Sequence, residues 1–145
     1  MLFRSEKLEL SAVALGIAEA AVADAIDYAG TRTQFGKPII AHQAIRHALA
    51  EARTQVLTMR LMLDHAARLV QAGQPSAVES SMTKLHCCET VADVALKCQR
   101  VLGAYGLSNL TDMERYVRDA ITLPIVGGSS NIQKNNIANR LRWPE

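Results

Sequence analysis

The chain has 145 residues, of which 49% are hydrophobic and 4% aromatic, and its formal net charge is +2. This length suits one compact domain, and a charge so close to neutral gives no general case for nucleic-acid binding. No apolar run is long enough to span a bilayer and the N-terminus lacks a secretory signal, so we expect a cytoplasmic protein without a membrane span. Few aromatics among many aliphatic residues favour packed helices over a β-sandwich.

The first predicted helix runs from Leu8 to about Gly30. Small and apolar residues recur there at steps of three and four, which marks one buried face. The face comprises Leu8, Ala12, Leu15, Ala18, Val22, Ile26 and Ala29.

The second predicted helix is longer, opens near Pro38 and closes at Gly73. Its apolar residues alternate steps of four and three without a break, like a coiled-coil seam. The seam comprises Ile45, Leu49, Ala52, Val56, Met59, Leu63, Ala66 and Val70. A shift of one residue would expose the whole stripe. We therefore expect burial of Ile45, Leu49, Val56, Met59 and Leu63, and of Leu85 in the next helix.

A third helix is predicted from Ser76 to the glycine tract that begins at Gly103. Its expected inner face comprises Val78, Met82, Leu85, Cys88, Ala92, Ala95 and Leu102. Cys87, Cys88 and Cys98 fall in this helix, and their odd number and spacing fit neither a disulfide framework nor a zinc site. We expect reduced, buried or half-buried cysteines and no metal.

Two shorter helices follow. Thr111 and Glu114 have the spacing of a capping box that opens a helix through Ile121, and Ser130 with Gln133 can cap another that ends near Arg140. No convincing strand is visible. The prediction is an all-α fold, an antiparallel up-down four-helix bundle with an additional short C-terminal helix, in one domain over residues 1–145.

Two loop segments carry chemistry. Residues 32–39 read Arg-Thr-Gln-Phe-Gly-Lys-Pro-Ile, and a guanidinium beside an aromatic ring suits a charged, planar ligand. Residues 127–134 read Gly-Gly-Ser-Ser-Asn-Ile-Gln-Lys at an expected helix start, where free N–H groups favour an anion.

With Val-Leu-Gly-Ala-Tyr-Gly-Leu at 101–107 and Arg-Tyr-Val-Arg-Asp-Ala at 115–120, these segments resemble the C-terminal helical domain of acyl-CoA dehydrogenases, from about Ser5 to Leu141. The resemblance implies an FAD-dependent oxidoreductase of fatty acid metabolism that dehydrogenates an acyl-CoA thioester and works as a homodimer or homotetramer. It also implies an electron-transfer flavoprotein or similar acceptor. In that family two further domains hold the flavin ring and much of the acyl chain, so we expect the 145-residue chain alone not to turn over.

The resemblance also implies a set of cofactor residues. Arg32, Thr33, Gln34 and Phe35 would reach the FAD of a neighbouring subunit, with His42 and Gln43 close by. In the glycine tract, Arg100 stands where the family has Gln and Ala104 replaces a Gly, beside Gly103. Read alone, His42 and the two glycines of the tract are ordinary features of helix ends. The remaining implied cofactor residues are Ser129, Ser130 and Asn131.

The base is the main departure from the family pattern. Gly127 stands where the best-known members carry the Glu that abstracts the α-proton, although its backbone N–H can still bond the thioester oxygen. An ungapped count from Arg32 brings the alternative base position of some branches onto Glu6. Asn139 replaces a family Arg. The implied substrate residues are Arg4, Lys7, Gly128 and Arg140, which as isolated residues are equally ordinary surface groups.

Three other readings stay open at this point. The chain fits a non-catalytic partner subunit or structural oligomerisation domain, or a flavin oxidase or monooxygenase that tolerates Gly127. A ferritin-like di-iron bundle is excluded, because it needs Glu-x-x-His pairs and no Glu in the sequence has a His three places on.

Overall fold

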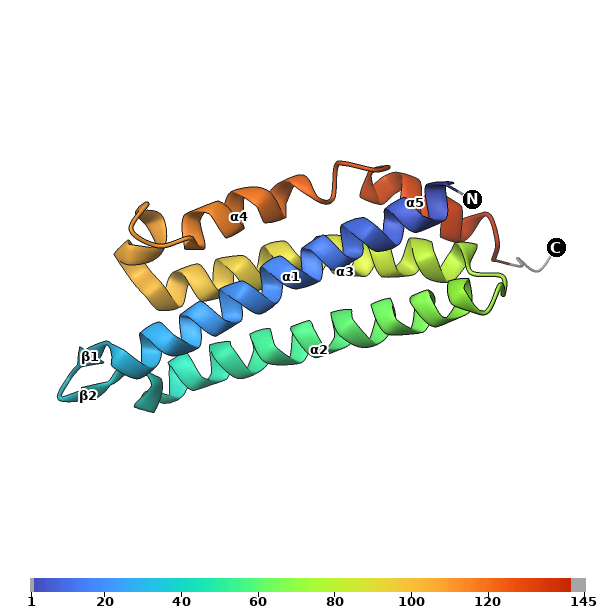
Figure 1. Ribbon diagram of the computed structural model, residues 1–145. Coiled ribbons are helices and arrows are strands. Elements are labelled where there is room, and N and C mark those ends of the chain that lie inside the picture. Colours follow the sequence, from blue (N-terminus) through green and yellow to red (C-terminus); the bar gives the residue numbers. More distant parts are fainter. Residues whose placement is uncertain (1, 142–145) are drawn as a thin grey trace.

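The computed structural model describes residues 2–141, with side chains from Glu6 onward. Three long helices, α1 (Leu2–Thr31), α2 (Gln43–Gln71) and α3 (Ala77–Leu102), run antiparallel to their chain neighbours (Figure 1). The shorter α4 (Met113–Thr122) and α5 (Ser130–Ala138) follow each other along α3 and together take the place of a fourth long helix. Short 3₁₀ helices η1 (Ile39–Ala41) and η2 (Gly103–Leu107) lie before α2 and after α3. The all-α bundle with a short last helix is confirmed.

Two very short strands were not expected. β1 (Thr33–Gln34) pairs antiparallel with β2 (Lys37–Pro38), with Thr33 opposite Pro38 and Gln34 opposite Lys37. Phe35 and Gly36 between them both have positive φ, as a two-residue type I′ hairpin turn requires. Strands of two residues are too short to leave an alternating pattern in the sequence.

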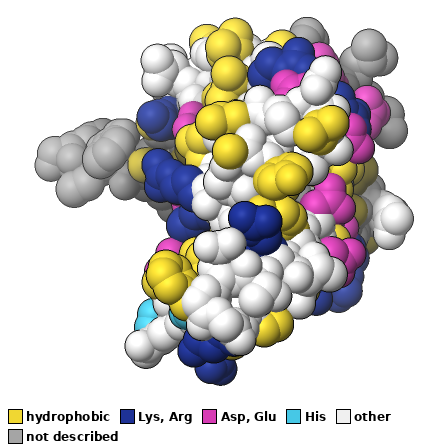
Figure 2. Space-filling view, turned by 90° about the vertical axis from the view of Figure 1, so that its left-hand side faces the viewer, with side chains coloured by type: hydrophobic (Ala, Val, Ile, Leu, Met, Phe, Trp, Pro, Cys, Tyr) yellow, Lys and Arg dark blue, Asp and Glu magenta, His cyan; other side chains and the backbone are white. Residues whose placement is uncertain are grey.

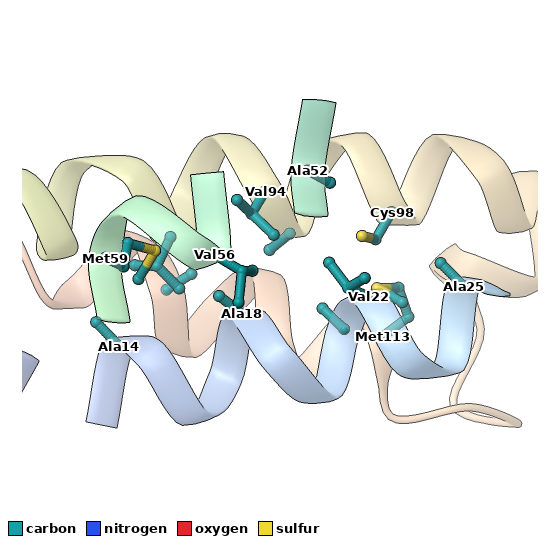
Figure 3. Close-up of a cluster of buried hydrophobic side chains, with 14 of the residues drawn as sticks. Ala14, Ala18, Val22, Ala25, Ala52, Val56, Met59, Val94, Cys98 and Met113 are labelled. Carbon is teal, nitrogen blue, oxygen red and sulfur yellow. The ribbon is translucent and has the colours of Figure 1, made fainter. Parts of the chain in front are cut away.

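The core lies where α1, α2 and α3 meet, and Figure 3 shows alanines of α1 facing Val56 and Met59 of α2 and Val94 and Cys98 of α3. Small side chains on α1 let the backbones approach closely. Leu49, Val56 and Met59 are buried as expected, and so are all three cysteines. Ile45, Leu63 and Leu85 are only half-buried, so the prediction of their burial was too strong.

Two predicted faces were partly wrong. On α1, Ala12 and Ile26 are exposed and the buried line runs instead through Ser11, Ala14, Ala21 and Ala25. On α3, Met82 is exposed, and the buried residues extend to Ser80, Ser81, Thr83 and Lys84. The physical reason is that α3 packs against all four other helices, so polar residues are enclosed along with apolar ones. Val70 near the end of α2 is exposed as well.

Both predicted caps were wrong. Thr111 donates its hydroxyl to the Tyr105 carbonyl at 3.1 Å, and Glu114 instead pairs with Arg118 at 2.7 Å. Ser129, not Ser130, precedes α5, and the Gln133 amide turns back to the Gly128 carbonyl at 2.9 Å. Partners four to six residues away took these side chains in place of the bonds that a capping box offers. The helix boundaries also shift, because α1 already begins at Leu2 and α5 ends at Ala138.

Within the described residues, no helix is long and apolar enough to cross a membrane.

Candidate functional site

The predicted site residues divide into two sets. The hairpin, the start of α2 and the end of α3 lie at one end of the bundle, whereas the start of α1 lies at the other end (Figure 1). The loop between α4 and α5 lies against α3, where Gly128 contacts Lys84 and Ser130 contacts Glu89. Glu89 and Arg100 are 11 residues apart on α3, a rise of about 17 Å at 1.5 Å per residue, so the loop and the hairpin end are separate within one chain.

The hairpin end presents an unusual aromatic residue. The Phe35 side chain is 92% exposed and its backbone has φ 53°, a left-handed conformation that costs a bulky residue free energy. Its ring lies 5.9 Å from the His42 ring, edge to face, and His42 Nε2 is 3.3 Å from the Gln34 carbonyl oxygen. Strain and exposure together are typical of a surface that binds something outside the chain.

Basic and apolar groups surround this aromatic residue. Arg32 and Lys37 are exposed, and among the described residues the Arg32 side chain has no hydrogen-bond or ion-pair partner. Figure 2 looks onto this end and shows Lys and Arg side chains lying among hydrophobic ones. The surface offers free cationic donors beside flat apolar groups, as a nucleotide requires.

The glycine tract reaches the same end. The Tyr105 ring lies 5.9 Å from the ring of Tyr28, the residue whose carbonyl accepts the Arg32 N–H at 2.8 Å. Gly103 has φ 59°, and a Cβ on Gly106 would lie 2.7 Å from the Gln99 carbonyl oxygen. The backbone of the chain therefore requires glycine at both positions, whether or not a ligand binds there. Arg100 and Ala104 beside them are exposed.

The other end holds a pocket of about 530 Å³ between α1, α3, α5 and the α4–α5 loop. It is lined by Glu6, Lys7, Ala77, Ser81, Gly127, Gly128, Ile132, Gln133, Asn136, Asn139 and Arg140. The pocket brings together five predicted residues from three remote parts of the sequence, Glu6 and Lys7, Gly127 and Gly128, and Arg140. Arg4 belongs to α1, but its side chain lies outside the described residues.

Glu6 lies directly beside Gly127. A Cβ built on Gly127 would be 3.5 Å from Glu6 Oε1, and it would collide with Leu10 Cδ1. A side chain at position 127 is thus excluded by Leu10, while a carboxylate from α1 reaches the same place. Sequence counting put Glu6 near this position; only the packing of α1 against the loop shows the proximity.

The loop offers backbone donors on the same side. Gly127 and Gly128 have φ 60° and 86°, and among the described residues no group accepts a hydrogen bond from either N–H. Ser129, Ser130 and Asn131 follow at the start of α5. Ser130 donates its hydroxyl to the Glu89 carboxylate, so that hydroxyl is engaged within the chain.

Three further polar residues frame the pocket. Lys7 Nζ donates to Ser81 Oγ at 2.8 Å. Lys84 and Gln133 are buried and both donate to the Gly128 carbonyl oxygen, at 2.7 and 2.9 Å. Sequence reasoning missed Lys84 and assigned Gln133 to a helix cap. A lysine one helical turn from Ser80 and Cys88, inside an otherwise uncharged stretch, was the available signal.

Comparisons with known proteins agree with this arrangement. A family model described as "Acyl-CoA dehydrogenase, C-terminal domain" matches residues 1–142. The chain is similar to the short/branched chain specific acyl-CoA dehydrogenase of Bos taurus, with 36% identity over 91% of the chain and 31% of that protein. It is 40% identical to the benzylmalonyl-CoA dehydrogenase of Aromatoleum aromaticum over 90% of the chain and 34% of that protein.

A solved structure is similar as well. The butyryl-CoA dehydrogenase of Megasphaera elsdenii superposes with a TM-score of 0.93 and 32% identity, covering 94% of this chain and 36% of that one. The chain spans about a third of the length of the proteins it matches.

Proposed function

The chain belongs to the acyl-CoA dehydrogenase family, and we propose that it is the C-terminal helical domain of an FAD-dependent enzyme that oxidises an acyl-CoA thioester to the trans-2-enoyl-CoA. The observation that carries this proposal is the position of Glu6 next to Gly127. The loop has no side chain of its own at position 127, yet a carboxylate lies 3.5 Å from the place of the missing Cβ.

In this proposal Glu6 is the catalytic base. Its carboxylate accepts the proton from the α-carbon of the thioester, and the electron pair of that C–H bond forms the new double bond. The Gly127 N–H donates to the thioester carbonyl oxygen and stabilises the charge that develops there. FAD, when bound, accepts the hydride that leaves the β-carbon. Lys7, Gly128 and Arg140, with Arg4, are proposed to contact the substrate around the same pocket.

The cofactor would be shared between two chains. Arg32, Thr33, Gln34 and Phe35, with the half-buried His42 and the exposed Gln43, form one set at the hairpin end, and the end of α3 adds Arg100, Gly103 and Ala104. Ser129, Ser130 and Asn131 form the other set, beside the middle of α3, where Ser130 contacts Glu89 about 17 Å along the helix from Arg100. The free Arg32 guanidinium and the exposed Phe35 ring fit a cofactor held by a second subunit.

This division supports a homodimer or a homotetramer, because a closed pair of chains can bring the hairpin end of one to the pocket end of the other. An electron-transfer flavoprotein or similar carrier is the proposed acceptor of the electrons.

A Glu6→Gln variant of the intact protein tests the function. Gln keeps the size and most hydrogen bonds but cannot accept the proton, so flavin reduction by an acyl-CoA under anaerobic conditions should slow by ~100-fold or more. Bound flavin per chain should stay the same. Glu9→Gln, an exposed glutamate one turn along α1, is the matched control and should behave as wild type.

Three results would contradict the proposal in different ways. Near-normal flavin bleaching in Glu6→Gln excludes Glu6 as the base. A wild-type protein that no acyl-CoA reduces, but that activates a catalytic paralogue, is a non-catalytic partner subunit. Oxygen consumption coupled to flavin reoxidation would indicate an oxidase or monooxygenase.

A further inference from the structure

Lys84 is a fully buried cation. Its side chain is 0% exposed, and its Nζ donates to the carbonyl oxygens of Leu123 at 3.2 Å and Gly128 at 2.7 Å. Among the described residues no carboxylate lies within ion-pair distance of this ammonium. Its partners are therefore backbone dipoles, and its charge is not cancelled by a neighbouring anion.

Burying a charged side chain in this way costs a helical bundle folding free energy. An ammonium removed from water loses its hydration, and an apolar side chain of similar volume often stabilises a core at least as well. Packing alone does not account for a lysine at this position, and its hydrogen bonds to the α4–α5 loop indicate a role in that loop.

The two carbonyls belong to the two ends of the α4–α5 loop. Leu123 follows α4 directly, and Gly128 precedes Ser129 at the start of α5 (Figure 1). One ammonium thus fastens both ends of the segment that contains Gly127. The segment needs such a fastening, because its two glycines adopt positive φ angles and glycine restricts the backbone least of all residues.

The Gly128 carbonyl is held twice, by Lys84 Nζ and by Gln133 Nε2 at 2.9 Å. In a trans peptide the C=O and N–H bonds point in opposite directions, so a carbonyl fixed toward the core directs the Ser129 N–H away from it. A cation on the carbonyl oxygen also polarises the peptide, which strengthens that N–H as a donor.

The same fixing of the Gly128 peptide limits the conformation of the two residues before it. Gly127 and Gly128 line the pocket beside Glu6, and their own N–H groups have no acceptor among the described residues. Gln133 of α5 lines the same pocket, and its buried Oε1 has no hydrogen-bond partner in the part of the chain that the structure describes. The loop and the start of α5 therefore present polar atoms that the described residues do not satisfy.

We propose that Lys84 is a positioning residue, whose buried ammonium fixes the Leu123–Gly128 loop so that its backbone N–H groups meet the substrate carbonyl oxygen beside Glu6. The proposal rests on the proposed function for the identity of that oxygen. The positive charge behind the loop adds to the dipole of α5 and favours negative charge on the oxygen as the α-proton leaves.

The test uses Lys84→Met in the intact protein, with Lys97→Met as the matched control. Lys97 lies on the same helix, half-buried, and pairs with Asp93 and Gln55 on the side away from the loop. Amide hydrogen exchange, read by mass spectrometry without substrate, should accelerate on the order of ten-fold or more in residues 124–130 and stay unchanged in residues 43–71.

The second readout is anaerobic flavin reduction by saturating acyl-CoA, counted per bound flavin. It should slow by about ten- to hundred-fold in Lys84→Met, less than the loss from deleting an oxyanion donor outright, and should be normal in Lys97→Met. Lys84→Gln keeps an N–H donor without the charge, so its rate of flavin reduction should lie between those of Lys84→Met and Lys97→Met. It replaces Lys84→Met in the test if that variant does not fold.

The outcomes separate the two proposals. Unchanged exchange in residues 124–130 of Lys84→Met overturns the positioning role. Uniformly faster exchange in every helix, together with a normal rate of flavin reduction per bound flavin, also overturns it, because Lys84 would then only stabilise the fold. If the loop opens selectively but wild type reduces no flavin with any acyl-CoA, the positioning of the loop stands and the proposed function fails.

Discussion

Replacing Gly127 with alanine should destabilise the protein in a way that depends on Leu10. Gly127 has φ 60°, and a Cβ added there would collide with Leu10 Cδ1. Two separate costs follow from the same methyl group. One is the left-handed backbone of a residue with a Cβ, and the other is the displacement of a leucine that packs against the core cluster.

The two costs have different magnitudes. A left-handed conformation costs a non-glycine residue about 1–2 kcal/mol. Forcing Leu10 away from its rotamer costs about 0.5–1.5 kcal/mol. Gly127→Ala should therefore lower the free energy of unfolding by about 1.5–3.5 kcal/mol. Leu10→Ala removes the colliding atom but not the backbone cost, so the pair should show a favourable coupling of about 0.5–1.5 kcal/mol.

The assay is denaturant unfolding of the four proteins of the double-mutant cycle, followed by far-UV circular dichroism. Gly128→Ala is the control, because its φ is 86° but its Cβ would approach Gln133 Nε2, at 2.9 Å, instead of Leu10. It should be destabilising without any coupling to Leu10→Ala. Strict additivity of Gly127→Ala and Leu10→Ala, within about 0.3 kcal/mol, would refute the reasoning.

Two further predictions concern the cofactor and the cysteines. Arg32→Ala should lower flavin affinity about ten-fold or more, by losing a charge-assisted contact to phosphate, and leave stability unchanged because the side chain has no partner among the described residues. Lys37→Ala is the control, and equal flavin retention on dilution in both variants would count against the assignment. Burial raises the pKa of Cys87 and Cys98 to about 12 and that of Cys88 to about 11. The folded state thus holds these protons more tightly, so their contribution to stability is complete below pH 9 and declines as the pH rises toward 11. Stability measured from pH 8 to 11 should fall more steeply than in a variant with all three replaced by alanine; identical slopes would contradict this.

Much of the fold was predictable because the buried face of a helix leaves apolar residues at every third or fourth position of the sequence. The unbroken three-four repeat in α2 located a real seam, with Leu49, Val56 and Met59 buried as expected. The same reasoning was less successful for α3, where a single inner face was assumed. A helix enclosed on several sides has no single face, and periodicity alone does not reveal how many neighbours a helix will have.

Caps were a second limit of local reasoning. The capping-box spacing of Thr111 and Glu114 is present, but each side chain has another partner within reach once the chain folds, Tyr105 and Arg118. Tyr105 lies six residues away in η2, and Arg118 lies four residues away, one turn along α4. The local pattern predicted that a helix begins near Thr111, but not which hydrogen bonds the side chains of Thr111 and Glu114 make.

By itself the sequence determined the helical class, the two loop motifs and their family resemblance, because these depend on residue type and short spacing. Tertiary structure decided which distant residues meet. Glu6 lies beside Gly127, and Lys84 beneath Gly128, only because α1, α3 and the α4–α5 loop close around one pocket. It also separated the two sets of cofactor residues, because the hairpin lies at the end of the bundle while the short helices α4 and α5 place Ser130 beside Glu89 in the middle of α3.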